Sequence, residues 1–159
     1  MRIPYLKRPY RKGVGIVLLH RDGRIFAGRR IDQVAEAWQM PQGGIDDGEA
    51  AIEAAAREFE EEVGTDKFRI IAESSHWRPY DLPEALADSV WRGRYRGQTQ
   101  KWFAARFTGE DSDIRVREVA EPEFEAWRWL DSNELMGLIV PFKRALYEEV
   151  LAEFADLLG

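Results

Sequence analysis

The sequence predicts an α/β fold in which helices pack against a mixed sheet. Short apolar runs of strand length recur along the chain, separated by turn residues. A segment of strong helix formers without Gly or Pro, residues 50–63, interrupts these runs, and an amphipathic segment follows at residues 140–158. With 159 residues and 45% hydrophobic content, the chain is expected to form one domain, residues 1–159, with a substantial core.

The first half of the chain predicts a hairpin, a broken strand and a helix. GVGIVLLH (13–20) and RIFAGRR (24–30) have the composition of strands, and the turn residues RDG between them predict a hairpin. AWQMPQGG (37–44) predicts a short strand that Pro41 and two glycines interrupt. Residues 50–63 then predict a helix.

The second half predicts three further strands and a last helix. FRIIA (68–72) and QKWFAARF (100–107) are apolar enough to be strands, and WRPYDLPEAL (77–86) predicts a loop. EFEAWRWL (123–130) alternates as a strand with one buried face. The amphipathic segment 140–158 predicts a helix.

Composition restricts the compartment and the partners. The chain has no cysteine, which excludes disulfides, thiolate metal sites and cysteine nucleophiles. No apolar stretch is long enough to span a bilayer, and residues 1–13 lack the apolar region of a signal peptide, so we expect a cytoplasmic protein without a membrane partner. The net charge of -6 gives no general attraction to nucleic acid, and DNA is not expected. A local basic patch exists in the first 20 residues, which carry no acid and five cations: Arg2, Lys7, Arg8, Arg11 and Lys12.

Carboxylates crowd one part of the predicted helix. An apolar stripe recurs at helical spacing through Ile52, Ala55, Ala56, Phe59 and Val63. Glu58, Glu61 and Glu62 lie three and four residues apart on a different face, where like charges destabilise a helix unless a cation neutralises them. A hard divalent ion such as Mg²⁺ prefers such oxygen ligands. The alternative is a solvated acidic face on which Arg57 pairs with Glu61.

The spacing of charges and glycines in GGIDDGEAAIEAAAREFEEEVG (43–64) resembles the Nudix box of Nudix hydrolases. Only Thr65, just after it, departs from the family pattern, where a bulky aliphatic residue is usual. The resemblance implies an α/β/α sandwich with a mixed sheet and the box on its catalytic helix. It also implies that Glu58, Glu61 and Glu62 hold Mg²⁺ or Mn²⁺ over a diphosphate together with the Gly43 carbonyl, and that Arg57 orients the carboxylates.

The resemblance extends over nearly the whole chain. WQMPQGG, HWRPYDLP, GQTQKWF, PEFEAWRWL and PFKRALYEEV are similar to the branch of bacterial RNA pyrophosphohydrolases and dinucleoside polyphosphate hydrolases. That similarity implies phosphate contacts for Arg11 and Arg30, and it makes Glu123 a fourth metal-linked carboxylate and candidate general base. Further substrate contacts are expected at Tyr80, Lys101, Val140, Phe142 and Lys143, of which Val140, Phe142 and Lys143 would line a nucleobase site. The residues alone, without the resemblance, favour a non-functional interpretation in which Arg11 and Arg30 are surface charges, Glu123 is a solvated strand residue and Phe142 is a core residue.

The resemblance favours a metal-dependent hydrolase that removes pyrophosphate from the 5′-triphosphate end of RNA and also cleaves dinucleoside polyphosphates. A hydrolase acting mainly on dinucleoside polyphosphates is the alternative, since Tyr80 matches those enzymes. Pro79 lies near a proline of ADP-sugar pyrophosphatases, a weaker alternative. A non-catalytic binding module would usually lack box carboxylates, and none is missing here. An isoprenoid diphosphate isomerase would require a cysteine. We expect a monomer or weak oligomer.

Overall fold

The computed structural model describes residues 3–31 and 37–158. Within them the strands form one eight-stranded sheet, made of β1 (Tyr10–Leu19), β2 (Ile25–Arg30), β3 (Trp38–Gln39), β4 (Gln42–Gly44), β5 (Phe68–Glu73), β6 (Arg78–Asp81), β7 (Gly97–Phe107) and β8 (Phe124–Leu130). The helices of the same residues are α1 (Ala51–Val63), α2 (Glu84–Ser89), α3 (Ser132–Leu138) and α4 (Arg144–Glu153). None of these helices is long and apolar enough to cross a membrane.

A long parallel pair forms the centre of the sheet. β1 and β7 run side by side from Tyr10↔Gly97 to Leu19↔Arg106, while the other strand pairs are antiparallel, so the sheet is mixed as the sequence predicts. β5 and β6 pair with successive parts of the other edge of β7. β5 and β6 therefore lie beside opposite ends of the long β1–β7 pair.

The predicted hairpin forms, but its strands separate directly after the turn. β1 and β2 are in register at Leu19↔Ile25, after which β2 pairs with β3 and β8 instead. The edge of β1 further back is therefore available to β4, which pairs with it at Gly13–Gly15. This pairing places the PQGG segment, residues 41–44, against the centre of the sheet.

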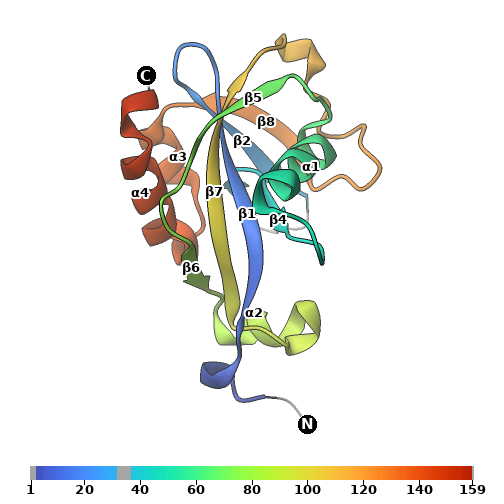
Figure 1. The fold of residues 1–159 in the computed structure, drawn as a ribbon, viewed down its shortest axis with the longest axis vertical. Coiled ribbons are helices and arrows are strands. Elements are labelled where there is room, and N and C mark those ends of the chain that lie inside the picture. The colour runs from blue at the N-terminus through green and yellow to red at the C-terminus, as the bar shows by residue number, and fades with distance from the viewer. Residues whose placement is uncertain (1–2, 32–36, 159) are drawn as a thin grey trace.

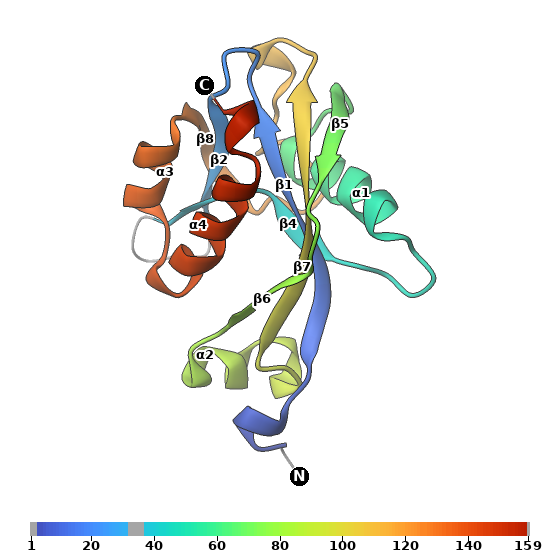
Figure 2. The same cartoon turned by 60° about the vertical axis from the view of Figure 1, so that its left-hand side comes forward.

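Helices cover both faces of the sheet. Figures 1 and 2 show α1 on one face and α3 with α4 on the other. Phe59 and Val63 of α1 pack with Val14, Ile16 and Phe103 in one core, and residues of α3 and α4 pack with Val17, Trp38 and Trp102 in the other. Apolar burial on both sides of the sheet stabilises the fold, and the α/β/α sandwich is confirmed.

The predicted loop at 77–86 is wrong in part, because the segment contains β6 and the start of α2. Pro79 is typical of a loop and is rare inside a strand. It pairs opposite Thr99 in an edge strand, where the missing N–H of a proline is tolerated. The short helix α3 was also missed, although its signal is present: Asp131 accepts a hydrogen bond from the Glu134 N–H at 2.8 Å, and Glu134 reciprocates with the Asp131 N–H, as in a capping box.

Other elements differ from expectation in detail. β8 is covered on both faces rather than one, since Ala126 packs against the core under α3 and α4 while Trp127 and Trp129 pack against the core under α1. The predicted last helix is α4 with a 3-10 turn on each side, Pro141–Lys143 and Ala155–Leu157. Pro141 occupies the first position of the 3-10 turn before α4, where its missing N–H is tolerated.

The buried stripe of α1 is rotated from the predicted one. Ile52 is 48% exposed, whereas Ala54 is fully buried, as are Ala55, Phe59 and Val63. Glu62 is buried as well, with 3% of its surface exposed. The buried face of α1 therefore includes a carboxylate, which apolar patterning does not predict.

A hydrogen bond between α4 and the PQGG segment is expected to stabilise the fold measurably. The fully buried Tyr147 hydroxyl accepts a 2.8 Å hydrogen bond from the N–H of buried Met40. Tyr147→Phe leaves that N–H without a partner and should lower the free energy of unfolding by about 1–3 kcal/mol, measured by urea denaturation. Tyr95→Phe, which removes a hydroxyl that forms no hydrogen bond within residues 3–31 and 37–158, is the control and should change the free energy of unfolding by less than about 0.5 kcal/mol. Equal effects of the two substitutions would contradict this assignment.

Candidate active site

Close packing of helix α1 against β4 builds the site. A side chain at Gly43 would overlap the carboxyl group of Glu58, so only glycine allows this carboxylate to approach the strand. A side chain at Gly44 would overlap the guanidinium of Arg11, which comes from β1 on the other face of the sheet. The two glycines thus permit a carboxylate and a guanidinium to approach one short strand.

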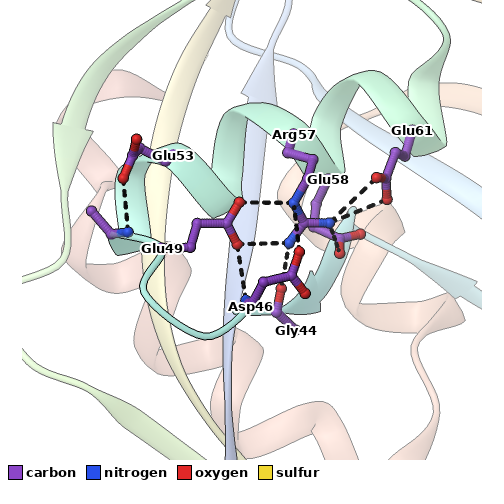
Figure 3. Close-up of polar contacts among 8 residues, drawn as sticks. Gly44, Asp46, Glu49, Glu53, Arg57, Glu58 and Glu61 are labelled. Atoms are coloured by element: carbon purple, nitrogen blue, oxygen red, sulfur yellow. Dashed lines mark hydrogen bonds and ion pairs between the residues drawn. The ribbon is translucent and has the colours of Figure 1, made fainter.

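Arg57 connects acidic side chains of α1 with those of the segment just before it (Figure 3). Its guanidinium donates two hydrogen bonds to Glu49, at 2.8 and 2.9 Å, and one to Glu58 at 2.9 Å. It reaches Glu61 at 3.3 Å and the Gly44 carbonyl at 2.9 Å. Such charge-assisted contacts fix the geometry of both partners. Arg57 also lies 3.5 Å from Asp46 Oδ2, so one cation contacts four carboxylates and ties α1 to β4.

The carboxylates on α1 are in different electrostatic environments. Hydrogen bonds from Arg57 lower the pKa of Glu49 to about 2. Burial raises the pKa of Glu58 to about 7, which the Arg57 hydrogen bond only partly offsets. Glu61 is much more open, with 57% of its side chain exposed. The arrangement excludes a simple solvated acidic face, because Glu58 and Glu62 face the protein.

Glu62 is the least compensated carboxylate of the site. Its Oε2 accepts a 2.9 Å hydrogen bond from the Gln42 N–H, and its buried Oε1 has no hydrogen-bond partner among the described residues. Burial, and then the neighbouring carboxyl groups of Glu123 and Glu58, raise the pKa of Glu62 well above its usual range. A buried oxygen without a donor is costly, and a proton or a cation would relieve it.

A groove of about 900 Å³ lies along these carboxylates. Its second wall is the segment before β8, and the 2.9 Å hydrogen bond from the Arg115 N–H to the Val63 carbonyl fixes that segment to the end of α1. The lining includes one arginine, Arg115, and eight acidic residues: Glu58, Glu60, Glu61, Glu62, Asp66, Asp113, Glu121 and Glu123. Glu123 is exposed and enters the groove just before β8. A groove so rich in carboxylates attracts cations.

The donor set suits a hard divalent ion. Glu58, Glu61, Glu62 and Glu123 offer only carboxylate oxygens, which Mg²⁺ and Mn²⁺ accept without thiolate or imidazole. In the described residues no three acidic or histidine side chains already cluster closely enough to surround one ion. Arg57 holds Glu58 and Glu61. The unpartnered Glu62 Oε1 is the atom that most clearly fits a cation.

A second polar cluster lies on the opposite face of the sheet. The Lys143 ammonium, 4% exposed, donates hydrogen bonds to Gln39 Oε1 at 3.1 Å and Gln42 Oε1 at 3.2 Å. It also lies 5.4 Å from the centroid of the Tyr80 ring, which stacks with Phe142 at a centroid distance of 6.2 Å. A cation beside two stacked aromatic rings can bind a planar base or a phosphate.

Of the predicted substrate contacts, Arg30, Tyr80, Phe142 and Lys143 lie in or beside this cluster. Arg30 donates a 3.3 Å hydrogen bond to the same Gln39 oxygen as Lys143. Val140 precedes the 3-10 turn of Phe142 and accepts its 3.1 Å hydrogen bond from the Lys143 N–H. The Arg11 guanidinium lies against Gly44, and the neighbouring Gly43 lies against the Glu58 carboxyl. Arg11 is therefore between this cluster and the carboxylates.

Lys101 lies apart from the other predicted contacts. Side chains alternate along β7, with Trp102 in the core under α4 and Phe103 in the core under α1, so Lys101 is on the α1 face. It forms a 3.4 Å ion pair with Glu73 of β5. The structure therefore does not bring Lys101 together with Tyr80 and Lys143, and its expected substrate contact stays a prediction.

Glutamines are the part of the site that sequence reasoning missed. Gln42 bonds Glu62 through its backbone and Lys143 through its side chain. Gln100 donates to Gln42 at 3.3 Å and to Gln98 at 2.6 Å, and all three are partly or fully buried. The sequence does contain an indication of this cluster, since PQGG and GQTQ place glutamines in otherwise buried strands. Buried amides need hydrogen-bond partners, so these glutamines could be expected to contact one another.

Comparison with known proteins gives one family and close relatives. The NUDIX domain family matches residues 9–150. A protein of Rhodospirillum rubrum named RNA pyrophosphohydrolase is 56% identical over 147 residues, which are 92% of this chain and 88% of that protein. A protein of Rickettsia canadensis with the same name is 52% identical over 97% of this chain and 95% of its own.

Solved structures share the fold at lower identity. The E. coli dihydroneopterin triphosphate pyrophosphohydrolase superposes with a TM-score of 0.66 and 24% identity, over 91% of this chain and 99% of its own. The C. elegans Ap4A hydrolase in a binary complex gives a TM-score of 0.66 at 18% identity, over 92% and 98% of the two chains. At these identities the likeness establishes the fold alone.

The uncompensated Glu62 predicts a pH-dependent effect of one substitution. Because the pKa of Glu62 is raised in the folded state, stability falls as pH rises above its unfolded pKa of about 4.5 and the unfolded chain ionises more readily. Glu62→Gln removes that loss and keeps an acceptor for the Gln42 N–H. Without divalent ions, the variant should therefore melt on the order of 2–4 °C above the parent at pH 8, roughly 1 kcal/mol, with little difference at pH 4. Glu60→Gln, on the exposed face, is the control. A Glu62→Gln protein less stable than the parent at pH 8 would refute this.

Proposed function

Since the chain belongs to the Nudix family of hydrolases, we propose that it is a metal-dependent pyrophosphohydrolase that removes pyrophosphate from the 5′-triphosphate end of RNA. Its relatives at 56% and 52% identity bear the name RNA pyrophosphohydrolase and align over nearly all of this chain. The structural observation that carries the proposal is the buried, unpartnered Glu62 oxygen in an acidic groove that Glu58, Glu61 and Glu123 also line.

We propose Glu58, Glu61, Glu62, Glu123 and the Gly43 carbonyl as the ligands of Mg²⁺ or Mn²⁺. When bound, the ions supply charge neutralisation at the phosphates and an activated water. The role of Arg57 is to present Glu58 and Glu61, which it contacts at 2.9 and 3.3 Å. A carboxylate array that is positioned before substrate arrives needs less reorganisation during the reaction.

Glu123 is the candidate that accepts the proton of the attacking water. It lines the groove with the α1 carboxylates but lies on the exposed start of the β8 segment, outside the contacts of Arg57. A base has to reach the reacting water and retain an accessible carboxylate. Because Glu58 and Glu62 are fixed by hydrogen bonds from Arg57 and Gln42, Glu123 has more freedom to do so.

The opposite face supplies the substrate contacts. Arg11 and Arg30 provide guanidinium groups for phosphates, since planar guanidinium donors match phosphate oxygens. Tyr80 and Phe142 provide aromatic surface for a nucleobase, and Lys143 lies beside both rings. Gly44 brings Arg11 next to the carboxylate side of the strand, so one substrate could occupy both faces.

A dinucleoside polyphosphate hydrolase is the second candidate. The Tyr80 and Phe142 pair favours it, because stacking accepts a base without requiring a following RNA strand. Both substrates would present phosphates to the same residues. An ADP-sugar pyrophosphatase and a non-catalytic module are less supported, since every box carboxylate is present. We propose that residues 1–159 act as one domain, of which the family match spans 9–150.

The proposed base can be separated from a neighbour by kinetics. Glu123→Ala should lower kcat by about 100-fold or more, the usual contribution of a positioned general base, with little change in melting temperature. Glu121→Ala removes another groove carboxylate two residues away and should leave kcat within about twofold. A similar loss in both variants would show that the groove charge, not a base at Glu123, controls the rate.

The substrate class is decided by one comparison. We expect kcat/KM for a short 5′-triphosphate RNA to exceed that for diadenosine tetraphosphate by at least roughly tenfold, about 1.4 kcal/mol, in the same salt and Mg²⁺. Lys143→Ala should reduce that preference, because it removes a positive charge that favours a polyanion over a short ligand. Equal or greater kcat/KM for the dinucleotide would replace the proposed function by the second candidate.

A further inference from the structure

Residues 91–93, just after α2, have an unusual backbone. Trp91 has φ of 49°, Arg92 of 59° and Gly93 of 68°, so three consecutive residues are left-handed and two of them carry a Cβ. The turn is closed by hydrogen bonds from the Gly93 N–H to the Val90 carbonyl and from the Arg94 N–H to the Trp91 carbonyl. A bulky residue in this conformation is unfavourable, and such strain is found where the surrounding structure over-determines it, often at functional sites.

The strained turn places the Trp91 indole at Arg11. The guanidinium carbon of Arg11 lies 5.0 Å from the centroid of the Trp91 ring, the geometry of a cation–π contact. Other contacts fix Trp91 in turn. It packs against the core under α4, and its ring lies edge to face with the Tyr95 ring at a centroid distance of 6.0 Å. The indole is therefore a fixed surface for the guanidinium.

Stacking contacts, and not an ion pair with a carboxylate of the described residues, position the Arg11 guanidinium. This guanidinium also fills the space that a side chain at Gly44 would occupy. Within residues 3–31 and 37–158, no hydrogen bond or ion pair is recorded for Arg11. Stacking contacts use the face of a guanidinium and leave its in-plane N–H donors available, which a salt bridge would not.

From these contacts we infer that Trp91 is a positioning residue for the substrate's phosphates, acting through Arg11. The inference rests on the proposed function only in requiring a phosphate ligand. Gly44, against which the guanidinium lies, also accepts the Arg57 hydrogen bond, so the Arg11 donors are held one residue from the Gly43 and Glu58 contact. Without the indole, Arg11 retains its charge but loses the surface that fixes its direction.

The test uses a ligand with phosphorus groups but no nucleobase. Methylenediphosphonate, in which CH2 replaces the bridging oxygen, is titrated into the full chain in Mg²⁺ by calorimetry. Trp91→Leu should weaken its binding about three- to tenfold, the range of a partly desolvated cation–π contact. Trp91→Phe, which keeps a ring, should stay within about twofold. Trp77→Leu is the matched control, because its 42% exposed indole lies 6.0 Å from the Lys12 ammonium and makes no recognised contact with Arg11 among the described residues. If Trp91→Leu does not fold, Trp91→Met fills the site without a ring.

A double-mutant cycle assigns the effect to Arg11. In the Arg11→Ala background, Trp91→Leu should cause no further loss of binding, because the group it positions is gone. An unchanged affinity in the single variant, or an equal loss in both backgrounds, overturns the inference. A variant that raises KM for RNA while leaving methylenediphosphonate binding intact also overturns it, and assigns Trp91 to base stacking. Since the probe contains no RNA, failure of the RNA assay would reject the proposed function without affecting this result.

Discussion

The arrangement of the site depends on one guanidinium. Arg57 contacts Glu49 just before α1, Glu58 and Glu61 on α1, and the Gly44 carbonyl, which keeps these three carboxylates close together and fixes the helix to β4. The hydrogen bond to Glu49 is the main cause that raises the pKa of Arg57 further above its usual value. Glu62 lies outside its reach and is left with one buried oxygen unpartnered. Arg57 stabilises the charged form of Glu49, whereas burial raises the pKa values of Glu58 and Glu62. The two buried carboxylates are therefore the ones that a cation would stabilise.

Gln42 joins the two faces of the sheet. Its backbone N–H fixes Glu62 on the α1 face, and its side-chain oxygen accepts from Lys143 and Gln100 on the α4 face. β4 is only three residues long and pairs with β1 at Gly13–Gly15. A shift of Gln42 would therefore move both Glu62 and Lys143. The short strand is therefore placed where phosphates near the carboxylates and a base near Tyr80 and Phe142 could belong to one ligand.

The sequence predicted the elements whose own residues determine them. The helix at 50–63 and the strands at 13–20, 24–30, 68–72 and 100–107 formed near the expected positions, because propensity and apolar pattern agree there. The acidic cluster was also visible as spacing. What failed depends on partners distant in sequence: Pro79 is acceptable only because it lies in an edge strand, and Ile52 is exposed because α1 packs through Ala54 and Ala55. Neither the glutamine cluster nor the contact of Trp91 with Arg11 can be predicted from the helical or strand periodicity of the sequence.

The distribution of charge explains how an acidic protein could accept a polyanion. The net charge is -6, and the groove concentrates eight carboxylates against one arginine, so an RNA end approaching from that side alone would be repelled. Arg11, Arg30 and Lys143 instead gather near β4 and the opposite face, where their donors meet neutral amides, aromatic rings and glycine backbone. Phosphates can be attracted along that side and reach the carboxylates only where Gly43 and Gly44 bring the two regions together. Under the proposed function, divalent counter-ions would neutralise the carboxylates that repel a bare phosphate. The same repulsion would then make the groove selective for phosphate accompanied by metal.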